Sequence, residues 1–130
     1  MTYFLNLYKK ELMAHNYKEL QFWKRSKKLC VSIYQSTSNF PQEEKFGITN
    51  QIRRSAVSIP SNIAEGSSRS SIKYFRRFIE ISMGSAYKLE TQLSIANEIR
   101  YLSDNSSKAL LSELLSVIQM MSKFKSLLKL

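Results

Sequence analysis

Apolar residues recur three and four positions apart along most of this chain, and no other feature limits its fold more strongly. In one stretch they form a single stripe: Ile48, Ile52, Ala56, Ile59 and Ile63. A step of three or four residues returns a side chain to the same face of an α-helix, whereas a strand would need strict alternation. The 130 residues include only three glycines and two prolines, which leaves little material for the many turns of a β fold. The sequence therefore predicts a few long helices.

The same spacing continues in three further segments, separated by residues that favour turns. We expect helices over about 18–37, 42–65, 70–102 and 106–128. Pro60 interrupts the second apolar stripe without shifting its phase, so a kink is expected there. Gly66 is suited to the left-handed position that closes a helix. Four helices joined by short turns predict an all-α fold, an up-down four-helix bundle.

The N-terminal residues differ from the rest. We expect residues 1–15 to be a loosely ordered extension and residues 16–130 to form the bundle domain. Phe4, Tyr8 and Leu12 fall at helical spacing, so a short amphipathic helix is the alternative if something packs on it.

Several kinds of chemistry have no support in the sequence. Cys30 and His15 are the lone cysteine and histidine, so an intrachain disulfide, a cysteine metal cluster and a histidine-driven nucleophile are not expected. The GxxxxGK[ST] loop of P-loop nucleotide hydrolases is absent, as are an apolar run of membrane-spanning length and a signal-peptide pattern. We therefore expect a non-enzymatic, cytoplasmic protein with no cofactor and no metal.

The net charge of +10 favours a polyanionic partner. Counted along the chain, the excess is general and densest in the first 40 residues. A second cluster opens the third helix, where the partial positive charge of a helix N-terminus normally favours Asp or Glu. Arginines beside free backbone N–H groups suit phosphate, although the cations could instead be solvated or paired with acids of a neighbouring helix. The candidate nucleic-acid-binding residues are Lys24, Arg25, Lys28, Arg54, Arg69, Lys73, Arg76 and Arg77.

The apolar arcs of the first and fourth helices are wider than the stripe of a little over about 100° that one core requires. The extra width predicts a second burial surface, most simply an interface between subunits. A dimer would bury it as well as a larger ring would. The candidate interface residues are Phe22, Leu29, Ile33, Leu111, Leu115 and Ile118.

Three motifs carry a family resemblance: residues 16–20 (NYKEL) followed by Trp23, residues 40–44 (FPQEE), and QIRRSAVSIPSNIAEGSSRSS over residues 51–71. They resemble the small four-helix bundle proteins encoded within intervening sequences of bacterial 23S ribosomal RNA genes, and the likeness covers about residues 15–128. That family is similar to the accessory variability determinant proteins of diversity-generating retroelements, which form pentameric barrels, bind nucleic acid and associate with a reverse transcriptase. The resemblance implies a bundle fold, a homopentamer and possible RNA or DNA binding, but it transfers no binding residues.

These observations favour a homo-oligomeric bundle that binds nucleic acid, RNA more than DNA, through basic surface patches. The chief rival is a protein-interaction scaffold or accessory subunit that docks an acidic partner such as a reverse transcriptase. A third reading is a passenger protein of a selfish element with no function for its host.

Overall fold

The structure is a computed structural model that describes residues 17–128, and over this range the chain forms four long α-helices and no strand. They are α2 (Gln21–Ser36), α3 (Ile48–Ser67), α4 (Ile72–Glu98) and α5 (Asp104–Leu127). Short 3₁₀ turns precede α2 and α3, at η1 (Tyr17–Glu19) and η2 (Gln42–Glu44). The predicted extension over residues 1–15 lies outside the described residues.

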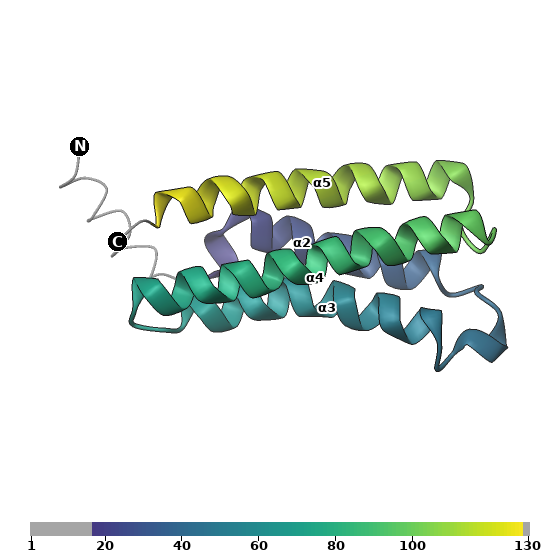
Figure 1. Ribbon diagram of the computed structural model, residues 1–130, viewed down its shortest axis with the longest axis horizontal. Coiled ribbons are helices and arrows are strands. Elements are labelled where there is room, and N and C mark those ends of the chain that lie inside the picture. The colour runs from purple at the N-terminus through teal and green to yellow at the C-terminus, as the bar shows by residue number, and fades with distance from the viewer. Residues whose placement is uncertain (1–16, 129–130) are drawn as a thin grey trace.

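The helices are arranged as the sequence predicts, in an up-down four-helix bundle. Consecutive helices run in opposite directions (Figure 1), and around the bundle α2 packs on α3, α3 on α4, α4 on α5, and α5 on α2. The connections are short, so consecutive helices must lie side by side and antiparallel. An up-down bundle then buries all four apolar faces in one core. Within the described range, no helix is both long enough and apolar enough to span a lipid bilayer.

The predicted apolar stripes form the core. Ile52, Ile59 and Ile63 of α3 are at most 1% exposed, and each such side chain stabilises the fold by about 1.5–3 kcal/mol. At one end of the bundle the ring of Phe124 lies between those of Phe22 and Phe75, with centroids 4.9 and 5.5 Å apart. The helical periodicity therefore identified the interior correctly.

The most extensive contact between two helices is that of α3 with α4, and small residues contribute to it. The buried Ser82 hydroxyl donates to the Ile59 carbonyl at 2.8 Å, so this polar group is satisfied inside the core. Gly66 lies inside α3 with an ordinary backbone conformation, which corrects its predicted role as a left-handed helix end. A Cβ on Gly66 would lie 2.6 Å from the Cβ of Phe78 on α4. The glycine is there for close helix approach.

Helix ends differ from the predictions by a few residues. α3 begins at Ile48 because η2 and the following turn occupy residues 42–47, and α4 ends at Glu98. Arg100 takes a left-handed conformation (φ 70°) that turns the chain, and the Tyr101 N–H bonds the Ala96 carbonyl at 2.9 Å, as in helix C-caps. α3 continues through Pro60 without a break.

Candidate nucleic-acid interface

The up-down topology collects the excess positive charge at one end of the bundle. The starts of α2 and α4 and the ends of α3 and α5 lie together (Figure 1). We call this end, residues 17–28, 58–85 and 116–128, the basic half, and the other described residues, 29–57 and 86–115, the neutral half. The basic half holds eleven Lys and Arg against three Glu, a net charge of +8, whereas the neutral half holds six charges of each sign. The apparently general excess is thus confined to one half of the described molecule.

Within the basic half, one carboxylate lies among four cations at the start of α4. Arg76 Nε, Arg77 Nη1 and Lys125 Nζ lie 3.8, 3.9 and 3.8 Å from the oxygens of Glu80. These distances are too long for hydrogen bonds, and the Nε of Arg76 is buried without a hydrogen-bond partner. Lys73 forms no ion pair or hydrogen bond with another described residue. Because Glu80 balances one charge at most, this cluster retains a strong positive field.

Arg69, in the turn before α4, contacts one carboxylate and one aromatic ring. Its Nη2 lies 3.1 Å from Glu65 Oε1, and its guanidinium lies 5.2 Å from the centre of the Phe78 ring. Its side chain is still 48% exposed. Exposed pairs of this kind hold an arginine only weakly, so Arg69 remains available to an anion.

Arg25 has a structural role that the sequence prediction missed. Its Nε and Nη2 donate to the two carboxylate oxygens of Glu113 at 2.8 and 3.0 Å, and Nη1 contacts the Met120 sulfur at 3.4 Å. The hydrogen bond from Arg25 lowers the pKa of Glu113 from its ordinary value, and the same bond raises the pKa of Arg25. The pair joins α2 to α5, so Arg25 is a poor candidate for binding phosphate.

The remaining predicted cations on α2 and α3 fall into two groups. Lys24 and Lys28 are exposed on α2 within the basic half. Arg54 is exposed on α3 but lies in the neutral half, away from the Glu80 cluster. The structure therefore separates Arg54 from the other seven candidates.

The sequence prediction also omitted cations that the fold adds to the basic half. Lys123 and Lys125 come from the last turns of α5, and Lys27 of α2 lies over the Trp23 ring, 5.2 Å from its centre. The α5 lysines lie far along the chain from the other candidates. Their position could have been inferred from the predicted topology, since the end of a fourth helix lies beside the start of a third.

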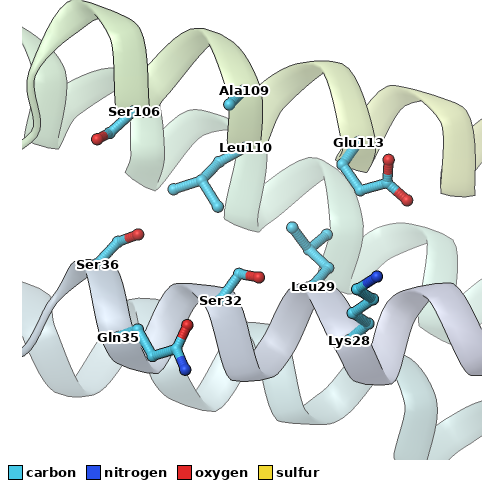
Figure 2. A pocket seen from close by; sticks show the side chains of 9 residues that line it. All are labelled: Lys28, Leu29, Ser32, Gln35, Ser36, Ser106, Ala109, Leu110 and Glu113. Carbon is cyan, nitrogen blue, oxygen red and sulfur yellow. The ribbon is translucent and has the colours of Figure 1, made fainter.

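A groove separates α2 from α5 on one side of the bundle (Figure 2). It has a volume of about 480 Å³, and Lys28 and Glu113 lie toward one end of it. Leu29 and Leu110 point toward each other at its base, and the remaining lining residues are small or uncharged: Ser32, Gln35, Ser36, Ser106 and Ala109. The groove is lined by several hydroxyl groups but by one cation, Lys28, so it does not extend the basic surface.

The predicted subunit interface needs correction. Phe22, Leu29, Ile33 and Ile118 are at most 5% exposed in a single chain, so a second copy could not contact them. The wide arcs exist because each helix packs against two neighbours as well as the core. Of the six residues, Leu115 is 47% exposed and Leu111 is partly buried. A larger set of exposed apolar residues, the apolar strip, follows the outer side of α4 and its C-cap: Ile81, Ile95 and Ile99.

Among residues 17–128 no cluster of three or more His, Cys, Asp or Glu side chains has the arrangement of a metal site. His15 lies outside the described residues. The Cys30 thiol is half-buried, and burial raises its pKa from the ordinary value, which makes it less reactive than a free thiol.

Comparison with known proteins agrees with this fold. No curated protein matches the chain. Among solved structures, the chain resembles a protein of unknown function from the S23 ribosomal protein family of Bacteroides thetaiotaomicron, at 21% identity and a TM-score of 0.72, over 79% of this chain and 96% of that one. Residues 18–123 match the family described as 23S rRNA-intervening sequence protein. This match covers all but the last turn of the bundle, and the chain therefore belongs to the 23S rRNA-intervening sequence protein family.

Proposed function

We propose that this protein is a non-enzymatic bundle that binds nucleic acid, structured RNA in preference to DNA, through the backbone phosphates. The observation that carries the proposal is the confinement of the whole excess charge of residues 17–128 to the basic half. A charge excess that served solubility alone would not need to gather at one end. Membership of a family tied to 23S rRNA genes supports RNA as the form of nucleic acid.

The contacts expected at this surface are charge-assisted hydrogen bonds from Lys and Arg to phosphate oxygens. The best-placed side chains are exposed and have no carboxylate within hydrogen-bonding distance among the described residues, since Arg77 Nη1 lies 3.9 Å from Glu80. They are Lys24, Lys73, Arg77 and Lys123. Their positions on three different helices spread the charge over a surface, which suits a folded RNA better than a narrow pocket would.

Salt dependence tests the proposal directly. Each phosphate neutralised steepens the fall of log affinity with log salt by about 0.7–0.9. We expect an RNA hairpin to bind with a slope of at least about −3 for four such contacts, measured by fluorescence anisotropy at several salt concentrations. Absence of binding at low salt, or a slope near zero, would refute the proposal.

The exposed apolar strip favours a second candidate function, a scaffold for a protein partner. Ile81 and Ile95 of α4 and its C-cap residue Ile99 are 38%, 45% and 47% exposed, and phosphate binding does not use them. A partner with an acidic surface, such as a reverse transcriptase, could contact both the strip and the basic half. A pull-down that survives nuclease treatment would favour this candidate over direct nucleic-acid binding.

Self-association through the same strip is part of the proposal. The resemblance implies a homopentamer, and a ring would repeat the basic half around its axis and add phosphate contacts without new residues. Ile95→Lys should shift the mass measured by light scattering toward that of one chain. A monomeric wild-type protein would contradict self-association and leave the phosphate surface standing.

A further inference from the structure

A shallow pocket lies over the first turns of α4, inside the basic half. Its volume is about 300 Å³, and it is lined by Lys73, Tyr74, Arg76, Arg77 and Glu80. Its lining thus brings one tyrosine together with three cations and one carboxylate. The predicted phosphate contacts account for the cations but give the ring no role.

Tyr74 differs from the other aromatic residues of the basic half. Phe22, Phe75 and Phe124 pack on one another in the core, while the ring of Tyr17 stands edge-on to that of Trp23 at 5.1 Å. Tyr74 is 59% exposed and makes no hydrogen bond or ring contact with another described residue. Burial in the bundle does not explain a tyrosine at this position.

The charges beside the ring suit an anion linked to a flat group. Lys73 precedes Tyr74 in the chain, and Arg77, whose side chain is 68% exposed, lies one helical turn later on the same side. Glu80 lies 3.8 Å or more from each of its cations, so a phosphate could replace it as their partner without breaking a strong bond. Aromatic faces flanked by such cations are the usual platform for unpaired bases.

We infer that this pocket holds an unpaired nucleotide, with the base stacked on Tyr74 and the adjoining phosphates on Lys73 and Arg77. The inference rests on the proposed function and narrows its target to RNA with single-stranded loops, bulges or ends. Base-paired RNA hides its base faces in the helical stack and can offer only its phosphates to the same cations.

The test compares two RNAs with equal numbers of phosphates, a hairpin with 2-aminopurine in its loop and a blunt duplex. Tyr74→Ala should weaken hairpin binding by about 5- to 150-fold, the range expected for one base–aromatic stack, and reduce quenching of the 2-aminopurine. Duplex binding should change by less than about twofold, and Tyr74→Phe should restore hairpin binding because it keeps the ring. Tyr87→Ala is the matched control, because Tyr87 is 52% exposed on the same helix but lies in the neutral half.

The outcomes separate this inference from the proposed function. If wild-type protein binds both RNAs and Tyr74→Ala weakens both equally or neither, the stacking inference is wrong and the phosphate surface stands. If wild-type protein binds neither RNA at low salt, the proposed function itself fails. A free mononucleotide should compete only weakly because it lacks the flanking phosphates, and competition at hairpin-like affinity would overturn the assignment to an RNA strand. Circular dichroism confirms that each variant remains helical.

Discussion

The two halves of the bundle share one fold but use their charged residues differently. In the neutral half, polar side chains close the loops: Tyr101 donates to Glu44 at 3.1 Å, and Asn97 and Arg100 both donate to Asp104, at 2.9 and 3.3 Å. In the basic half, cations outnumber carboxylates, and Glu80 is shared at 3.8–3.9 Å. The neutral half thus holds as many carboxylates as cations, and one of those carboxylates, Glu113, pairs with Arg25 of the basic half. The basic half keeps a net positive charge.

Charge reversal in each half should give the largest difference in RNA affinity between the two halves. Three changes to Glu in the basic half should lower RNA affinity by about 100-fold or more, because each removes a phosphate contact and adds repulsion. The same three changes in the neutral half should lower it by less than about fivefold, through net charge alone. The variants are Lys73→Glu, Arg77→Glu and Lys123→Glu against Lys45→Glu, Arg54→Glu and Lys108→Glu, measured by anisotropy at one salt concentration. Equal losses would mean that net charge, not its position, controls binding.

Substitutions at two glycines test whether close packing of α3 against α4 holds the basic half in place. Gly66→Ala should destabilise the protein by about 1–3 kcal/mol, because the new Cβ would lie 2.6 Å from the Phe78 Cβ and would push α4 away from α3. Gly84→Ala should stabilise it by about 0.5–1 kcal/mol, because nothing lies within 4 Å of a Cβ there and alanine favours a helix. Urea denaturation measures both. A stabilising Gly66→Ala would show that the α3–α4 contact is looser than described.

Single substitutions of Arg54 and Arg77 compare the contribution of one arginine from each half to RNA binding. Both arginines are exposed, and the sequence ranked them equally. Arg77→Ala should weaken RNA binding several-fold and reduce the salt slope by about 0.7–0.9, the value of one lost phosphate contact. Arg54→Ala should leave the slope unchanged. A larger loss of affinity and salt slope for Arg54→Ala than for Arg77→Ala would place the RNA-binding surface on the outer face of α3.

The smallest expected effect concerns the ion pair that joins α2 to α5. Hydrogen bonding to Arg25 lowers the pKa of Glu113 in the folded protein, so its contribution to stability is present above the ordinary glutamate pKa and is lost as pH falls through the lowered value. Both side chains are about two-fifths exposed, 38% and 40%, so the contribution is at most about 1 kcal/mol. Glu113→Gln should therefore lower the free energy of unfolding slightly at pH 7 and flatten its fall in acid. An unchanged pH profile would contradict this account.

The sequence predicted the helices well because a single physical rule, periodic burial, determines them. It failed where distant parts of the chain meet. The role of Gly66 depends on Phe78 across the α3–α4 contact, and Arg25 is engaged by Glu113, 88 residues away. Four of the six predicted interface residues are buried within one chain, because apolar arcs that looked too wide for one core cover the flanks between neighbouring helices. An interface at Leu111 and Leu115 stays a prediction.

The candidate site was predicted only in part for the same reason. The predicted cations Lys24, Lys28 and those from Arg69 to Arg77 do lie in the basic half. Net charge counted along the chain did not reveal the difference in charge between the two ends of the bundle, because the chain passes through both ends repeatedly. Lys123 and Lys125 join the site only through the antiparallel course of α5. Tyr74 is absent from the predicted site residues, because periodicity cannot tell an exposed ring from a packed one.

Lysine footprinting tests whether RNA binds at the basic half, because it compares both halves in the unmodified protein. Acetylation rates would be measured by mass spectrometry with and without saturating RNA hairpin, at three exposed lysines in each half. We expect several-fold slower acetylation in the basic half and unchanged rates in the neutral half. The lysines compared are Lys24, Lys73 and Lys123 against Lys45, Lys88 and Lys108. Equal protection in both halves, or none in the basic half while RNA is bound, would contradict a binding surface built from one end of the bundle.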